Sequence, residues 1–559
     1  MILIQIYDFE VFRYDWLVVI ADYNNREFKT IVNNPDQLIE YFNVHKNDIW
    51  VGFNNKNYDQ YIFKGILTGH NPYMISRHII ANKMPGFSYR DDMKKIYMSN
   101  YDVYNTLQHG LKFYEGSMGD SIEESSVSFD IERKLTEEEL KEVEKYCRHD
   151  VEETIKIFFK RKDDFVAQLG LIKLTGKPHL MPRTQTQIAS QMLNAEALTD
   201  TSDEFDVDIP PTLNLSKYSY IKEWYLDSNN MNYEKSLTTK VAGVDHIFGF
   251  GGLHGAREKY HHKGKILVMD VASLYPSLMI NYNLLSRAVV DPTIYKELRD
   301  KRLQYKKEHN NLHLPLKLIL NKTYGAMKDR NNTLYDPRNA NRVCIYGQLL
   351  LLDLIEKLEP YCTLIQSNTD GLFITDYVSK VYDIAEEWQG RTHLQLEFTE
   401  AVEIWQKDVN NYVLTLQDGS LKTKGAYVKE LSDLDYGDYP IINKAIINYL
   451  TKNIPVEQTI NSNTSLIDFQ MVCKITGKFS AIYYGNTRLQ EKCVRVFAGP
   501  TTNPGIFKQH AESLSFYKIP NTPEHVFIDN TDIHGKLVPS TLDKKFYIDL
   551  AKRRLEEFI

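Results

Sequence analysis

Carboxylates inside or directly after apolar, strand-like runs constrain this chain more than any other feature. The run Ile2–Ile6 leads into Asp8 and Glu10, the run KILVMD ends in Asp270, and Asp370 lies in the turn of a predicted hairpin. A charged side chain in such a run must meet solvent or a cation, because burying it unpaired is costly. The pattern therefore predicts β-sheets with acidic sites at the ends of their strands.

Length and composition set the broad class. A chain of 559 residues corresponds to about three to four domains. With 43% hydrophobic and 25% charged residues it is an ordinary globular sequence, which argues against a disordered or fibrous protein. The net charge of −7 does not exclude nucleic acid, which needs only a local basic surface. The five cysteines form no CxxC pair, so they indicate a reducing cytoplasm and neither disulfides nor zinc.

The chain shows no fixed repeat, and no apolar run reaches the ~18 residues that span a bilayer. Its start reads as a first strand rather than a signal peptide. A capping box at Thr136 and Glu139 starts a predicted long helix. The expected elements are strands at Ile2–Ile6 and Leu17–Ala21, helices at Glu137–Arg161, Tyr295–His309, Leu314–Lys328 and Leu542–Phe558, a hairpin at Tyr361–Ile374, and strands within Ala401–Tyr427.

The first acidic group lies near the N-terminus. Asp8 and Glu10 are two apart on a strand and so share a face, and Tyr146 and Asp150 are four apart on a helix. With Asp59 from GFNNKNYD, four carboxylates could hold two divalent cations ~4 Å apart for phosphodiester hydrolysis. Taken singly, an Asp-x-Glu pair is usually an exposed polar face, and a lone Tyr is usually core packing. The hypothesis rests on the combination.

The second acidic group pairs Asp270 with Asp370. After Asp270, Ser273 and Leu274 can offer backbone N–H groups to a phosphate. One predicted helix face carries a cation, an amide, an aromatic ring and a gap, which suit a nucleotide: Lys317, Asn321, Tyr324 and Gly325. The preceding helix adds Arg302 and Lys306. The plain alternatives are a strand-to-turn transition, a helix that ends at a glycine cap, and a solvated basic face.

The order of these motifs resembles a known family. YDFE, GFNNKNYD and YCRHD resemble the three motifs of proofreading 3′→5′ exonucleases of the four-carboxylate, tyrosine type; Lys145 stands where the histidine subtype has His. DVASLYPS, KLILNKTYG and SNTDG resemble the three polymerase motifs of family B DNA polymerases. FGFGG is similar to the linker motif between the two activities, and KTKGAY resembles the lysine motif that grips the primer. The resemblance covers about residues 7 to 430.

The resemblance implies a fold. It is an α/β and α+β multidomain protein, with an RNase H-like exonuclease domain followed by a right-hand polymerase. The implied domains are the exonuclease at 1–165, a connector at 166–245, palm segments at 246–285 and 329–430, fingers at 286–328, and a thumb or C-terminal DNA-binding region at 431–559. The short interval between Asp270 and Lys317 implies short fingers. The resemblance then implies poor strand displacement without a helicase.

The resemblance also implies residue roles. The metal ligands are Asp8, Glu10, Asp59 and Asp150 in the exonuclease, and Asp270, Asp370 and the Val271 carbonyl in the palm. Tyr146 orients the attacking water, and Asn54 contacts the strand being cut. Lys317 and Arg302 clamp the triphosphate with help from Lys306, Tyr275 packs under the sugar and excludes ribose, and Asn321 and Tyr324 line the new base pair, beside Ser273 and Leu274. The implied DNA contacts are Gly251, Gly252, Lys422 and Lys424.

The implied cofactors are two divalent cations per site, Mg²⁺ or Mn²⁺. The implied partners are primer–template DNA, deoxynucleoside triphosphates and a helicase or single-strand-binding protein, with no membrane. We expect a monomeric replicase of a bacteriophage or mobile element, acting in the host cytoplasm.

One departure matters: Asn368 stands where the family has a first Asp in its palm hairpin. An amide is a weaker ligand for a hard cation. Either Asp270 and Asp370 suffice, or the polymerase site is slow or dead and the chain is a DNA-binding exonuclease. A non-catalytic scaffold would need both acid groups to be vestigial, and Tyr275 argues against RNA synthesis. In the last segment, basic residues such as Arg495 alternate with aromatics such as Phe497, which suits DNA or an ordinary surface.

Overall fold

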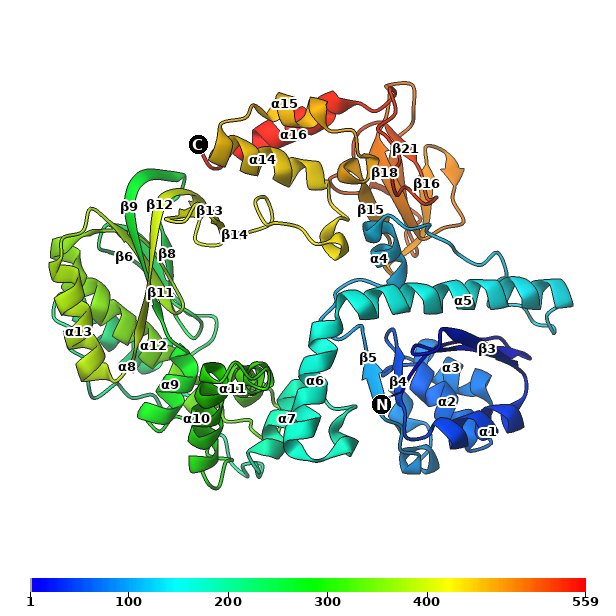
Figure 1. Ribbon diagram of the computed structural model, residues 1–559, viewed down its shortest axis with the longest axis horizontal. Coiled ribbons are helices and arrows are strands. Elements are labelled where there is room, and N and C mark those ends of the chain that lie inside the picture. Colours follow the sequence, from blue (N-terminus) through cyan, green and yellow to red (C-terminus); the bar gives the residue numbers. More distant parts are fainter. Residues whose placement is uncertain (1–2) are drawn as a thin grey trace. The chain divides into compact units, whose positions relative to one another are not determined.

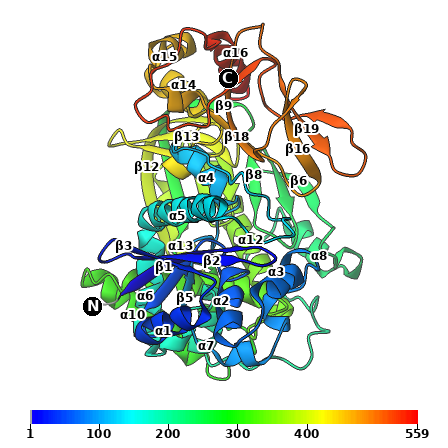
Figure 2. The ribbon, with the colours of Figure 1, turned by 90° about the vertical axis from the view of Figure 1, so that its right-hand side faces the viewer.

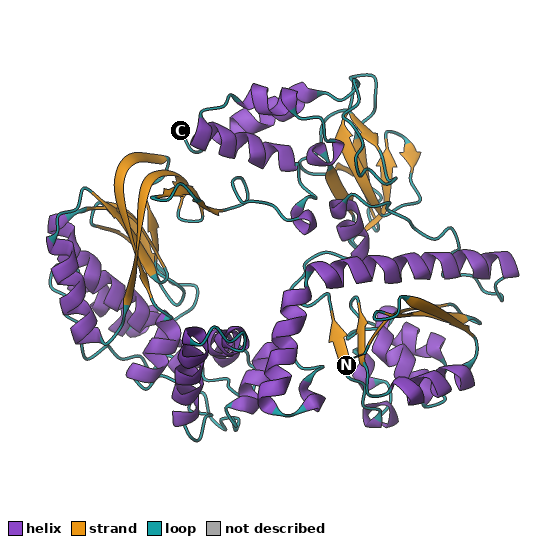
Figure 3. Cartoon of the chain, viewed as in Figure 1, coloured by secondary structure: helices purple, strands orange, loops and turns teal. Residues whose placement is uncertain are grey.

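A computed structural model describes residues 3–559 (Figure 1). Its internal contacts divide the chain into two compact units. The first unit consists of Met1–Arg183, Leu431–Pro440 and Asn463–Phe546; the second consists of Thr184–Glu430, Ile441–Ser462 and Tyr547–Ile559. Both units mix helices with sheets (Figure 3), so the expected α/β and α+β multidomain class is confirmed.

The first unit begins with a five-stranded sheet of order β3-β2-β1-β4-β5. The first three strands run antiparallel, whereas β4 and β5 run parallel to β1, which is the arrangement of an RNase H-like sheet. Both strands expected near the N-terminus are present. The strands are β1 (Ile4–Val11), β2 (Trp16–Asp22), β3 (Glu27–Val32), β4 (Ile49–Gly52) and β5 (Asn100–Asp102).

Helices cover both faces of this sheet because its strands are apolar on both sides. One core joins alternate residues of β1 and β2 to α1, α2 and α3, and the other joins the remaining residues to α4, α5 and α6. Figure 2 shows α5 lying along β1 and β2. The predicted capping box of α5 is present at Thr136 and Glu139. The helices are α1 (Pro35–His45), α2 (Asp59–Leu67), α3 (Pro72–Ile80), α4 (Leu111–Met118), α5 (Glu137–Lys160) and α6 (Lys162–Thr175).

Two smaller antiparallel sheets, β15-β18-β21 and β17-β16-β19-β20, complete the first unit. Here Arg495 and Phe497 are fully buried, so the idea that they face DNA is wrong. The Arg495 guanidinium donates to the carbonyls of Gly116 and Asp120 and so ties β18 to the end of α4. The strands are β15 (Met471–Lys474), β16 (Phe479–Tyr484), β17 (Thr487–Arg488), β18 (Cys493–Ala498), β19 (Ile506–His510), β20 (Phe516–Lys518) and β21 (Val526–Ile528).

The second unit is built on a nine-stranded sheet of order β14-β13-β12-β9-β11-β10-β8-β7-β6. The helices α12 and α13 cover one of its faces (Figure 3). Along β9 the side chains alternate, so Asp270 shares a face with Val268 and the cluster of Phe373 and Tyr412. The strands are β6 (Leu237–Val241), β7 (Val244–Phe248), β8 (His254–Ala256), β9 (Tyr260–Val271), β10 (Thr363–Asn368), β11 (Gly371–Thr375), β12 (Leu396–Asp408), β13 (Asn411–Leu416) and β14 (Leu421–Lys424).

The remaining helices include those expected after Asp270 and at the C-terminus. Gly325 lies inside α11, so the alternative of a helix that ends at this glycine is excluded. Within residues 3–559, no helix combines the length and the low polarity needed to cross a bilayer. The helices are α7 (Gln185–Met192), α8 (Ser219–Leu226), α9 (Leu274–Asn281), α10 (Thr293–Lys307), α11 (His313–Lys328), α12 (Pro337–Leu358), α13 (Lys380–Thr392), α14 (Pro440–Lys452), α15 (Val456–Ser462) and α16 (Lys544–Leu555).

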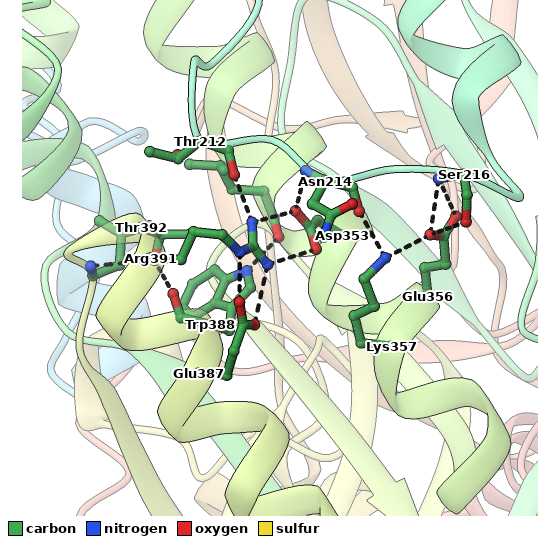
Figure 4. Close-up of polar contacts among 12 residues, drawn as sticks. Thr212, Asn214, Ser216, Asp353, Glu356, Lys357, Glu387, Trp388, Arg391 and Thr392 are labelled. Carbon is green, nitrogen blue, oxygen red and sulfur yellow. Dashed lines mark hydrogen bonds and ion pairs between the residues drawn. The ribbon is translucent and has the colours of Figure 1, made fainter.

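Within the predicted connector, residues 212–216 are fastened along the helices of the second unit (Figure 4). Arg391 of α13 donates to the Thr212 carbonyl and pairs with the fully buried Asp353 of α12 at 2.8 Å. One turn further along α12, Glu356 accepts from the backbone N–H of Ser216. The two carboxylates thus satisfy polar groups of this stretch.

Candidate active sites

The first acidic group assembles on β1, as the strand period predicts. Asp8 and Glu10 lie on the face of β1 that α5 covers, and Cys147 of α5 donates its thiol to the Asp8 carbonyl at 3.3 Å. The side-chain ligand atoms of these three residues lie within 4.8 Å of one another. The site is thus formed by a strand and a helix that are far apart in the sequence.

Asp59 and Asp150 complete this group. Asp59 begins α2, and its carboxylate accepts the Phe9 N–H, which lies between the two acids of β1, at 3.3 Å. Burial and then repulsion from Asp59, Glu10 and Asp150 raise the pKa of Asp8 well above its usual range. Burial raises the pKa of Asp59 to about 7, with Asp102 and Asp150 adding to it. The four carboxylates repel one another, which a hard cation bound between them would relieve.

Tyr146 and Asn54 lie at this group in different ways. Tyr146 is one turn before Asp150, and burial followed by Asp150 and Glu10 raises the pKa of its hydroxyl, which therefore stays a proton donor at neutral pH. Asn54 lies on the loop between β4 and α2 in a left-handed conformation, with φ of 60°. Its backbone N–H donates to Asp102 at 2.8 Å, which holds that loop in place.

Lys112 belongs to this site, although the sequence pattern did not single it out. Its ammonium forms an ion pair with Asp150 and donates to Glu115 at 3.0 Å, and it lies 4.5 Å from the centre of the Tyr146 ring. Burial opposes its charge, but Asp150 and Glu115 raise the pKa of Lys112 above its usual range. Glu115 is fully buried, and His149 lies 3.6 Å from its second oxygen.

The second acidic group opens into a cavity of about 820 Å³ in the second unit. Asp270 lies one residue before the end of β9, opposite Gly371 of β11 and Glu397 of β12. A Cβ at Gly371 would collide with the Asp270 carboxylate, so a larger residue there would displace that carboxylate. Burial, then the charge of Asp270, raises the pKa of Asp370, as expected for two acids that share a site.

The hairpin of β10 and β11 has a tight turn, as predicted from SNTDG. Asn368 pairs with Gly371, and Thr369 between them has φ of 44°. The Asp370 carbonyl accepts the Val271 N–H at 2.7 Å, which joins the hairpin turn to the end of β9. Asn368 lies opposite His254 of β8, and its side-chain oxygen accepts from the Thr369 hydroxyl at 3.4 Å. The backbone at position 368 is thus paired with a neighbouring strand, and its amide with the hairpin turn.

The helices α9, α10 and α11 form one wall of this cavity. The predicted residues that line it are Ser273, Leu274, Tyr275, Arg302, Lys306, Lys317 and Asn321. Arg302 lies 3.4 Å from the Ser273 hydroxyl, and burial lowers the pKa of Arg302. Tyr324 is not among the lining residues but packs against the Tyr275 ring, with centroids 4.3 Å apart.

Lys422 of β14 lines the acidic end of the cavity, whereas Lys424 does not line it. The Lys422 ammonium lies 3.7 Å from Asp270, and burial lowers the pKa of Lys424 although the charge of Asp370 opposes this shift. Gly251 and Gly252 do not line the cavity. The Gly251 carbonyl instead accepts from Gln348 at 2.8 Å, while Gly252 lies against Thr369 of the hairpin.

Two further charged residues of the cavity, an arginine and a glutamate, were missed from sequence. Arg299 lies three residues before Arg302 on α10, so helix spacing alone could have found it. Glu397 adds a third carboxylate beside Asp270, and only the register between β9 and β12 places it there.

The sequence was compared with family models and with curated proteins. No family model matches the sequence. The chain is similar to DNA polymerase 1 of Saccharolobus solfataricus, with 23% identity over 307 residues, which is 47% of this chain and 32% of the relative. It is similar to DNA polymerase 1 of Aeropyrum pernix, with 26% identity over 208 residues, or 30% of this chain and 22% of the relative. The matched part thus spans a third or less of each curated relative.

A solved structure of the family B DNA polymerase from the hyperthermophilic archaeon Pyrobaculum calidifontis aligns with all of this chain and 78% of its own. The TM-score is 0.45 and the sequence identity is 14%.

Proposed function

We propose that this chain is a family B DNA polymerase with a 3′→5′ proofreading exonuclease. The observation that carries the proposal is the presence of two separate carboxylate sites, one of which opens into a cavity with basic residues on its helical wall. Similarity to two archaeal DNA polymerases supports the synthetic half. The domain division inferred from the motifs, and a phage or mobile-element setting with a monomer in the cytoplasm, are part of this proposal.

Both acidic sites fit divalent cations. Their carboxylate oxygens are the ligands that Mg²⁺ and Mn²⁺ prefer, and the mutual repulsion of the acids favours a bound cation. The proposed ligands are Asp8, Glu10, Asp59 and Asp150 in the exonuclease, and Asp270, Asp370 and the Val271 carbonyl in the polymerase. When bound, the cations would supply charge neutralisation and a more acidic water or hydroxyl.

The side chains around the cavity would position the nucleotide. Arg302 and Lys317 would pair with the triphosphate, with Lys306 beside them on α10. Tyr275, braced by Tyr324, would pack under the sugar and exclude a ribose hydroxyl. Asn321 would line the new base pair with Tyr324. The backbone N–H groups of Ser273 and Leu274 would face phosphate oxygens at the start of α9.

DNA would be held by backbone and basic contacts. Lys422 and Lys424 would hold primer phosphates, which makes binding weaker as salt rises. Gly251 and Gly252 would allow the strand to approach the backbone closely. In the exonuclease site Asn54 would contact the strand being cut, and the Tyr146 hydroxyl would orient the attacking water.

A labelled primer on a longer template tests both activities. With Mg²⁺, wild-type protein should extend the primer when deoxynucleotides are present and shorten it when they are absent. Asp8→Ala should lose shortening and keep extension, whereas Asp270→Asn should do the reverse, so each variant is the folding control for the other. Failure of the wild type in both assays would refute the proposal.

Asn368 supports a second candidate, a DNA-binding exonuclease with a silent polymerase site, because an amide stands at a position where the family has a carboxylate. Shortening of the primer in the presence of all four deoxynucleotides, with no extension by wild-type protein, would favour this alternative.

A further inference from the structure

Lys112 places a cation inside the first acidic site. Its ammonium pairs with Asp150, one of the four carboxylates, and with Glu115, which lies on its own helix one turn later. The Lys112 side chain is only 12% exposed, so these contacts are screened little by water. Lys112 therefore links α4 to a proposed metal ligand on α5 through a mostly buried ion pair, unlike a surface lysine.

Lys112 also contacts the tyrosine of the site. The Tyr146 ring lies 4.5 Å from the ammonium. Tyr146 and Asp150 are four residues apart and so lie one turn apart on the same face of α5. A single charged group therefore fixes both the carboxylate and the ring, because moving either one breaks a contact with Lys112. This is the arrangement expected of a residue that sets the orientation of its neighbours.

The buried Glu115 beside Lys112 explains why the lysine stays in place. Glu115 is fully buried, and His149 lies 3.6 Å from its second oxygen. Side-chain atoms of Glu115, His149 and Asp150 lie close enough together to resemble a metal site, but Lys112 already contacts both carboxylates. The ammonium thus stands where a further cation would otherwise bind.

We infer that Lys112 is a positioning residue of the exonuclease site, a built-in cation that orients Asp150 and Tyr146 and competes with divalent metal for the Asp150 carboxylate. The inference rests on the proposed exonuclease function. It has two consequences of opposite sign. Removing the charge should tighten divalent-cation binding, because one competitor for Asp150 is lost. It should slow hydrolysis, because the carboxylate and the tyrosine lose their common anchor.

The test compares Lys112→Met, which keeps most of the unbranched length but not the charge, with Lys112→Arg. Lys156→Met is the matched control, since Lys156 also pairs with two carboxylates of the first unit, Asp120 and Glu153, at 2.7 Å each. All variants carry Asp270→Asn and Asp370→Asn, which silence the second site. Mn²⁺ binding is measured by electron paramagnetic resonance, and hydrolysis by shortening of a single-stranded labelled oligonucleotide at saturating metal.

For Lys112→Met we expect Mn²⁺ dissociation constants to fall by about 3-fold or more and the rate at saturating metal to fall by about 10-fold or more. Lys112→Arg should keep most of the rate, and Lys156→Met should match the parent in both measurements. A purely structural role would weaken binding and activity together, and that result would overturn the inference. Unchanged binding or an unchanged rate in Lys112→Met would also overturn it.

Two additions keep the result decisive. If Lys112→Met does not fold because Glu115 is left unpaired, Lys112→Met with Glu115→Gln removes both charges and should still bind Mn²⁺ more tightly than the parent. If the parent does not shorten DNA, the proposed exonuclease function fails, and the sign of the change in Mn²⁺ affinity alone decides whether Lys112 competes for Asp150.

Discussion

Replacing Asp59 by Asn should stabilise the metal-free protein at alkaline pH. Burial and neighbouring acids raise the pKa of Asp59 from 3.8 to about 7. Because the pKa in the folded state exceeds that in the unfolded state, the proton stabilises the folded protein fully below pH 3.8. That stabilisation is lost as the pH rises through about 7.

The pKa values set the size of the effect. A difference of about 3 pH units corresponds to about 4 kcal/mol of unfolding free energy at pH 8. Asparagine does not ionise and can still accept the Phe9 N–H. Because the neighbouring carboxylates share the repulsion, we expect the unfolding free energy of Asp59→Asn at pH 8 to exceed that of wild type by about 2–4 kcal/mol. This corresponds to roughly 4–8 °C in melting temperature. Exonuclease activity should be lost, as a proposed metal ligand is removed.

The assay is thermal unfolding in EDTA at pH 5 and pH 8. The melting temperature of Asp59→Asn should be clearly above that of wild type at pH 8, and the difference should be much smaller at pH 5. Glu139→Gln is the opposite control: Arg133, followed by the Thr136 backbone, lowers the pKa of Glu139 to about 2, so its charge stabilises the fold at both pH values. An Asp59→Asn protein that melts at or below the wild-type temperature at pH 8 would refute the reasoning.

Three further predictions concern the second site. Asp370→Asn should reduce primer extension by on the order of 100-fold or more, whereas Asn368→Ala should cost less than about 10-fold; equal, near-complete loss in both, measured by single-nucleotide addition, would contradict this ranking. Tyr275→Val should raise ribonucleotide relative to deoxynucleotide incorporation by about 10-fold or more, and an unchanged ratio would remove Tyr275 from sugar selection. Wild-type protein alone should stall when the template is already duplex, and extension through several hundred base pairs of duplex would disprove the expected dependence on a helicase.

Local sequence patterns were sufficient for the elements that carry the acids. The capping box at Thr136 predicts where α5 begins, because a cap depends on residues three apart. Alternation along a strand places Asp8 and Glu10 on one face, and Gly371 after Asp370 predicts the hairpin turn. The spacing of Lys317 and Asn321 likewise predicts that they share a helix face, and both line the cavity.

Contacts between residues far apart in the chain could not be predicted from such local patterns. Arg495 looks like a DNA-binding residue in a basic, aromatic stretch, yet it is buried and donates to main-chain carbonyls near α4. Glu397 joins Asp270 only through the register of β12 against β9. The contacts of Lys112 depend on how α4 packs against α5.

The sequence by itself therefore determined six of the acids and the local elements that carry them, because turns, caps and strand alternation depend on residues a few positions apart. Glu397 was found only through strand register. The tertiary structure alone decided which cations meet those acids, since ion pairs such as Lys112 with Asp150 join residues far apart in the chain. Their partners are chosen by helix packing and strand register, which no short pattern encodes.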